Sequence, residues 1–150
     1  DPEEIKKKRG TYRKDRNNPN APHPMLVGDT TPPIWLKNII ARQEWERGAP
    51  HLITTRVLTH EDLGVLGAYC QSFADWIMAQ EKIEREGQII ETPMGKRKHP
   101  AVMIAHDAQL AMARFASELG MTPASRGKVE SLPEGSEAKG QFWFEGGEKK

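Results

Sequence analysis

The feature that most constrains the fold is a predicted helix of about 27 residues between Thr59 and Gly87. Thr59 with Asp62 three residues later is a capping-box signal at the start, and Gly87 is a residue type that often ends a helix. Apolar side chains recur between them at helical spacing. The predicted buried stripe consists of Leu63, Leu66, Cys70, Phe73 and Ile77, widened by Tyr69, Trp76 and Ile83. Such a helix is about 40 Å long, whereas a compact body of about 100 residues is about 34 Å across. We therefore expect either frayed helix ends or an elongated subunit that packs against a neighbour.

A helix is also predicted on the N-terminal side of this long one. We expect it to begin at Thr30-Thr31-Pro32-Pro33, because threonine caps helices and proline fits the first turn. Pro50 should end or kink it. Its predicted buried face consists of Ala41, Trp45, Ala49 and Leu52.

A third principal helix is predicted between Pro100 and Gly120, and its alanines allow a close approach to another helix. Its predicted stripe is Ala101, Ala105, Ala108, Met112, Phe115 and Leu119. Thr122-Pro123 predicts a short fourth helix. Residues 88–99 combine a β-rich run, a Pro-Met-Gly turn and a basic return, which predicts a hairpin. The expected fold is therefore mainly α, with three principal helices, one of them long, and a short β-hairpin between the second and the third.

Composition divides the chain into a body and two flexible segments. Residues 1–32 are basic and rich in proline, and residues 131–150 form a polar, glycine-containing tail; neither holds enough apolar side chains to offset its ordering entropy. Residues 33–130 are the predicted helical body. The whole chain carries a net charge of +1, but residues 5–16 hold seven cations and one acid, a charge of +6. The remainder is therefore mildly acidic.

Neither a catalytic centre nor a metal site is expected from the residue pattern. His23, His51, His60, His99 and His106 lack the spacing of a zinc site, and no phosphate-binding glycine loop is present. His99 precedes Pro100, where helix capping is the expected role. Cys70, the single cysteine, falls on the apolar stripe, where a buried thiol acts as a small hydrophobe. We expect no cofactor, no enzymatic activity, no membrane span and a reducing, cytoplasmic setting.

Two basic clusters are candidates for DNA binding, because lysine and arginine neutralise phosphates with little regard to sequence. The first cluster, in the N-terminal arm, comprises Lys6, Lys7, Lys8, Arg9, Arg13, Lys14 and Arg16. The second comprises Lys96, Arg97 and Lys98 in the predicted hairpin. The alternatives are a solubilising tail for the first and surface charge without a partner for the second.

Three consecutive aromatic residues, Phe142-Trp143-Phe144, lie in a tail that is otherwise polar. Aromatic side chains in such segments usually act as anchors on a partner protein. The alternative is that the segment packs against the body of its own chain.

The order of these signals resembles the small terminase subunit of tailed bacteriophages. The resemblance is carried by Asn-Pro-Asn-Ala-Pro at 18–22, by Glu44-Trp45-Glu46-Arg47 with Pro50 and Leu52, by Val57-Leu58-Thr59-His60-Glu61-Asp62 with Ala68-Tyr69-Cys70, by Lys98-His99-Pro100-Ala101, and by residues 115–126. The last stretch ends in Gly120-Met121-Thr122-Pro123-Ala124-Ser125-Arg126 and is the most specific.

The resemblance implies a helical protomer that assembles into a closed homo-oligomeric ring in the host cytoplasm. The ring would bind double-stranded viral DNA near the packaging start and deliver it to the large terminase subunit, which carries the ATPase and nuclease. A ring would also cover the stripes that a single subunit leaves exposed.

A transcription regulator with a helix-turn-helix is the alternative function. The first two predicted helices, joined near residues 54–59, could form such a unit. However, the second opens with His60, Glu61 and Asp62, and acidic side chains at that place repel phosphates.

Overall fold

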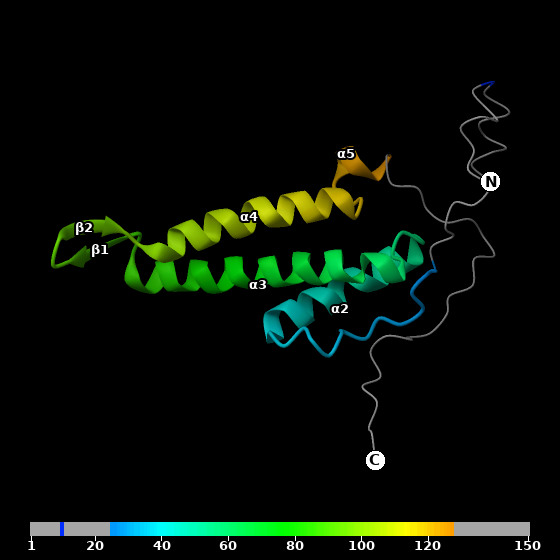
Figure 1. Cartoon of the computed structure of the whole chain (residues 1–150), viewed down its shortest axis with the longest axis horizontal. Coiled ribbons are helices and arrows are strands. Elements are labelled where there is room, and N and C mark those ends of the chain that lie inside the picture. Colours follow the sequence, from blue (N-terminus) through cyan, green and yellow to red (C-terminus); the bar gives the residue numbers. More distant parts are fainter. Residues whose placement is uncertain (1–9, 11–24, 128–150) are drawn as a thin grey trace, which may run out of the picture.

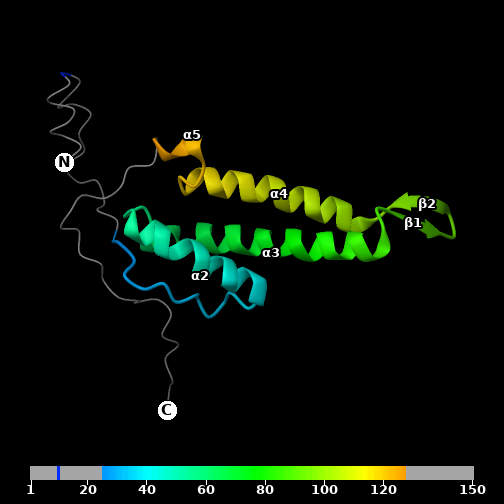
Figure 2. The same ribbon diagram turned by 180° about the vertical axis from the view of Figure 1, so that it is seen from behind.

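The computed structural model describes residue 10 and residues 25–127. Its elements are the helices α2 (Ile39–Thr54), α3 (Leu63–Glu86), α4 (Pro100–Glu118) and α5 (Pro123–Arg126), the 3-10 turn η2 (His60–Asp62), and the strands β1 (Ile89–Thr92) and β2 (Gly95–Lys98). Helices α3 and α4 run side by side and antiparallel, and the hairpin projects from the end where they are joined (Figure 1). Helix α2 packs on α3 near the opposite end (Figure 2). The predicted mainly helical fold with one hairpin is confirmed.

The long helix forms between the two signals that the sequence contains. The Thr59 backbone N–H and hydroxyl both donate to Asp62 Oδ2, at 3.1 and 2.6 Å, and Gly87 ends the helix with a φ of 82°. The first turn is 3-10 and the remaining 24 residues are α-helical. Because α3 is helical as far as Glu86, its ends are not frayed, and the subunit is elongated.

Helix α2 begins later than predicted. The start expected at residues 30–33 is wrong, because the carboxylate of Asp29 accepts both the backbone N–H and the hydroxyl of Thr31, each at 2.8 Å. Asn38 caps the helix instead, and its Oδ1 accepts from the backbone N–H of Ile40 at 2.9 Å.

Pro50 was expected to end or kink α2, and the first of these alternatives is wrong, since the helix continues to Thr54. Ala49 and Leu52, on either side of the proline, are both buried. Their burial outweighs the one backbone hydrogen bond that proline cannot donate.

The main core surrounds Trp45, which is 1% exposed. The predicted face of α2 is confirmed, because Ala41, Ala49 and Leu52 are buried in the same cluster. Residues 25–32, predicted to belong to the N-terminal arm, pack on this core as well. Leu26 and Val27 are buried, Leu26 forms a β-bridge with Thr59, and Trp45 Nε1 donates to the carbonyl of Thr30 at 3.0 Å. The part of the chain that packs on the helices therefore begins before residue 33, the predicted start of the body.

A second, smaller core joins the distal parts of α3 and α4. Ala79 packs with Ala101 and Ala105, and the half-buried side chains of Trp76 and Ile83 lie against them. Of the predicted stripes, Phe73, Ile77, Met112 and Phe115 are half-buried rather than buried. In the distal part of the pair, two helices pack without a third layer, and the fully covered side chains there are the small ones of Ala79, Ala101 and Ala105.

The two glycines near the start of α3 should respond to alanine in opposite ways. A Cβ at Gly67 would overlap the Trp35 ring, whereas a Cβ at Gly64 meets nothing within 4 Å. Gly67→Ala is expected to lower the free energy of unfolding by about 1–3 kcal/mol through overpacking. Gly64→Ala should raise it by about 0.5 kcal/mol, because alanine favours the helix. Urea unfolding of both variants checks this, and equal effects would contradict the close approach of Trp35.

Candidate nucleic-acid interface

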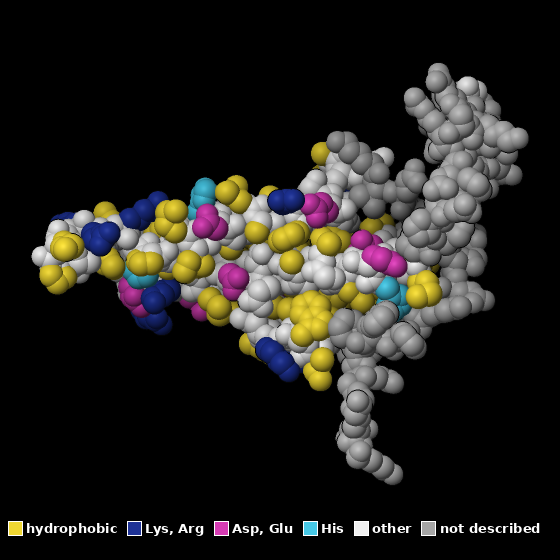
Figure 3. Space-filling model, viewed as in Figure 1, with side chains coloured by type: hydrophobic (Ala, Val, Ile, Leu, Met, Phe, Trp, Pro, Cys, Tyr) yellow, Lys and Arg dark blue, Asp and Glu magenta, His cyan; other side chains and the backbone are white. Residues whose placement is uncertain are grey.

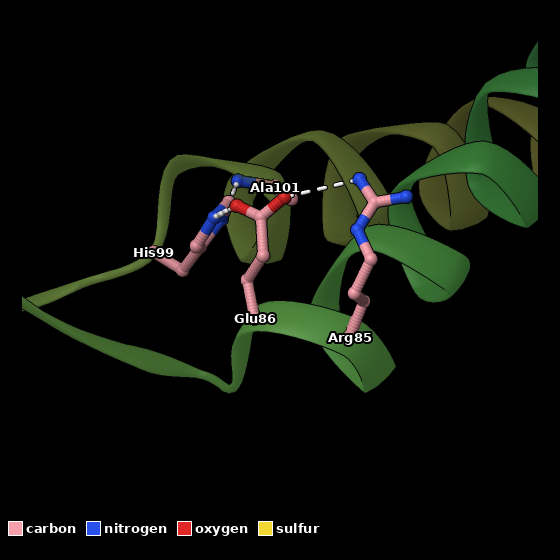
Figure 4. A network of polar contacts seen from close by, with 4 residues as sticks. All are labelled: Arg85, Glu86, His99 and Ala101. Carbon is pink, nitrogen blue, oxygen red and sulfur yellow. Dashed lines mark hydrogen bonds and ion pairs between the residues drawn. The ribbon is translucent and has the colours of Figure 1, made fainter.

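The base of the hairpin is held by a network around His99, which is 4% exposed. His99 Nδ1 accepts from the backbone N–H of Ala101 at 2.9 Å and so caps α4 (Figure 4). Because Nδ1 is an acceptor, the proton of the neutral ring lies on Nε2, which donates to Glu86 Oε2 at 2.9 Å. Arg85 donates to Oε1 of the same carboxylate at 3.0 Å. The capping role expected for His99 is confirmed.

This network also stabilises the ionised form of Glu86. The hydrogen bond from His99, and then the one from Arg85, lower the pKa of the Glu86 carboxyl. Both partners favour the ionised carboxylate. The end of α3, the end of β2 and the start of α4 are therefore tied together at one anchored point.

The hairpin that extends from this point presents cations in a fixed register. Lys96 pairs with Glu91 and Arg97 with Ile90 across the strands, and Lys96 Nζ lies 4.0 Å from Glu91 Oε1. The strand alternation directs Lys96 and Lys98 to one face and Arg97 to the other. All three side chains are exposed. The predicted hairpin cluster is therefore ordered and accessible, an arrangement that suits contact with a phosphate backbone.

The other predicted interaction residues lie outside the described part of the chain. They are Lys6, Lys7, Lys8, Arg9, Arg13, Lys14 and Arg16 of the arm and Phe142, Trp143 and Phe144 of the tail.

Cys70 lies in the main core, as its position on the apolar stripe predicts. Burial, and then the charge of Glu44, raise the pKa of its thiol from 9.0 to about 12. The thiol therefore remains protonated at neutral pH and packs as a small hydrophobe.

Within residues 25–127, no cluster of three histidine, cysteine or acidic side chains has a geometry that could hold a metal ion.

An ion pair with one buried partner lies beside Cys70, and it was not predicted from the sequence. Glu44 is 4% exposed, and Arg47 donates to both of its carboxylate oxygens, with Nε at 2.7 Å from Oε2. Burial, with the charge of Glu44 and a hydrogen bond to it, raises the pKa of Tyr69 to about 12. The i, i+3 spacing of Glu44 and Arg47 indicates an ion pair. It does not indicate that Glu44 is buried.

A cleft of about 620 Å³ lies next to this ion pair, between the C-terminal ends of α2 and α4 and the short helix α5. Its apolar lining comes from Leu52, Val57, Leu119 and Met121, and Arg47, His51 and Arg126 contribute cationic or titratable groups. The sequence analysis missed the cleft, although the motif at 120–126 supplies part of its wall.

Large apolar side chains also remain on the surface. The exposed ones on the helices and just before them are Ile34, Trp35, Ile39, Met78, Met103, Ile104 and Leu110. Figure 3 shows hydrophobic side chains along the length of the α3–α4 pair, interspersed with charged ones. Met103 and Leu110 are seven residues apart and lie on the side of α4 away from its buried alanines.

Comparison with known protein families shows what this chain is related to. The model of a family described as "phage terminase, small subunit" matches residues 41–136. The chain belongs to this family. The match runs from α2 through α5 and so includes the hairpin and the cleft of this terminase small subunit. Neither the curated proteins nor the solved structures contain a match.

The family assignment supports a role in genome packaging. Among residues 25–127 of the terminase small subunit, no helix is long and apolar enough to cross a membrane. At the start of its long helix, Glu61 is exposed and Asp62 is engaged in the cap with Thr59. These two acidic residues argue against α3 as a helix that reads DNA base edges.

His99 has two roles, since it caps α4 and donates to Glu86, and two substitutions should separate them. His99→Ala removes the cap of α4 and the partner of Glu86, and we expect a loss of about 1–2 kcal/mol in unfolding free energy. His99→Asn restores a capping acceptor and should recover most of the loss. Urea unfolding measures both variants, and equal losses would show that the cap contributes nothing.

Proposed function

We propose that this chain is the DNA-recognition subunit of a phage packaging motor, that it assembles into a homo-oligomeric ring in the host cytoplasm, and that it recruits and stimulates the large terminase subunit without catalysis of its own. Membership of the small-subunit family supports the packaging role. The observation that carries the DNA-binding part is the cationic hairpin, whose base is fixed by the His99 network.

The hairpin supports DNA contact because the strands that carry its cations are already folded, so only the side chains have to be ordered upon binding. Lys98 directly precedes the anchored His99, and Lys96 is held in register with Glu91. Each side chain that neutralises a phosphate releases counterions, which gives affinity that depends on salt rather than on sequence. The arm cations, seven in number, would add the same kind of contact.

The exposed apolar side chains support the ring. Leu110 is 59% exposed and Met103 is 52% exposed on the outer side of α4. In a cyclic assembly, a heterologous interface covers one face of each subunit with another face of its neighbour. Burying these side chains would favour association.

Hairpin cations are expected to contribute a measurable part of the salt dependence of DNA binding. Replacing Lys96, Arg97 and Lys98 by alanine should weaken binding to all DNA sequences and make the slope of log K against log salt shallower by up to about 3. Alanine at Lys6, Lys7, Lys8 and Arg9 should act in the same direction. Lys37→Ala, an exposed lysine just before α2 that belongs to neither cluster, is the control. An unchanged slope in either multiple variant would remove that cluster from the proposed interface.

Native mass spectrometry should detect one closed oligomer at micromolar concentration. Leu110→Glu places a charge in the expected interface and should shift the protein towards monomer while its helical circular dichroism is retained. A monomeric wild-type chain would contradict the ring.

Trp143 is expected to anchor the large subunit. Trp143→Ala should reduce stimulation of the large-subunit ATPase and leave DNA affinity unchanged, because the side chain supplies apolar contact and no charge. Gln141→Ala is the matched control. Loss of DNA affinity with full stimulation would reject the docking role.

A further inference from the structure

The cleft between α2, α4 and α5 combines an apolar interior with a cationic rim. Leu52 and Leu119 are buried at its floor, while His51 and Arg126 are exposed at its edge. Arg47 binds Glu44 and still keeps 65% of its side chain exposed. Cavities of this size commonly hold ligands through apolar contact with a few polar groups at the edge. The lining therefore suits an aromatic segment followed by an acid.

One segment of this chain has that composition. Phe142-Trp143-Phe144 is followed directly by Glu145. Aromatic rings fit an apolar floor and attract arginine through their faces, and a carboxylate is the natural partner of arginine. No ion pair engages Arg126 within residues 25–127.

The chain leaves the described structure beside the cleft. Arg126 lines the cleft, and Gly127 is the last described residue. Fourteen residues lie between Gly127 and Phe142, and this linker has a root-mean-square span of about 21 Å when flexible and at most about 50 Å when extended. A tether of this length gives a local concentration in the millimolar range. Even a weak contact would then be occupied within a single chain.

A second hollow on the body suits this segment less well. It measures about 250 Å³ and is lined by Gln80, Gln88, Lys98, His106 and Gln109 together with Ile83, Val102 and Ala105. Its three glutamines equal its three apolar residues in number, and it contains no arginine.

We propose that the cleft between α2, α4 and α5 is a binding site for the aromatic segment Phe142-Trp143-Phe144 of the same chain, with Glu145 against the Arg126 guanidinium. The small subunit then holds its aromatic segment on its own body. A partner that binds the same aromatic side chains must displace them from the cleft.

Cysteine pairs in the full-length chain test the site. His51→Cys with Gly146→Cys joins the cleft edge to the residue after Glu145, and Gln109→Cys with Gly146→Cys joins the second hollow to the same residue. Native Cys70 is buried and does not compete. In a glutathione buffer, we expect the first pair to form an intrachain disulfide at least 10-fold faster than the second. Intact-mass analysis under non-reducing conditions distinguishes a bond within one chain from a bond between chains.

Two further variants connect the rate to the proposed contacts. Serine at Phe142, Trp143 and Phe144 should remove most of the difference between the two pairs and leave only what the tether produces. Arg126→Glu should reduce the difference several-fold, whereas Arg114→Glu, on α4, should not. Equal rates for the two pairs, a difference that is unchanged in the serine variant, or a bond mainly between chains would overturn the proposal.

Adding purified large subunit should slow the disulfide between positions 51 and 146 by competition. Only this expectation rests on the proposed function. An unaffected rate would contradict docking of the large subunit at this segment, while the measurements on the chain alone would still support the cleft site.

Discussion

Close packing of α3 against α4 is the constraint on which the rest of this structure depends. Ala79, Ala101 and Ala105 provide the buried contact in the distal half, and their small side chains let two helix backbones approach each other. Larger residues there would push the helices apart and separate Glu86 from His99, whose side chains meet at 2.9 Å. The position of the hairpin therefore follows from the helix packing next to its base.

The elements that the sequence predicts well are those with local chemical signals. The Thr59–Asp62 cap, the stop at Gly87 and the His99-Pro100 start all act within a few residues. A reader of the sequence can find them because their hydrogen bonds close over short distances.

The features that the sequence did not reveal depend on contacts between distant residues. Pro50 is tolerated inside α2 because Ala49 and Leu52 are buried around it. The segment at Leu26 and Val27 packs because it pairs with the backbone before α3, more than 30 positions along the chain. The burial of Glu44 likewise appears only once α2 packs on α3, and the cleft only once α2, α4 and α5 are placed together, so no local pattern could have indicated them.

Helix α3 also sets the distance between the segment at Met25 and the hairpin. Met25 lies at its start, where its carbonyl accepts from the His60 N–H, and the hairpin follows its last residue, Glu86. Its 24 residues correspond to a length of about 36 Å. One turn of B-form DNA advances by about the same distance. A straight duplex lying along the long axis of one protomer would therefore present equivalent backbone positions, on the same side of the double helix, to the two ends of α3.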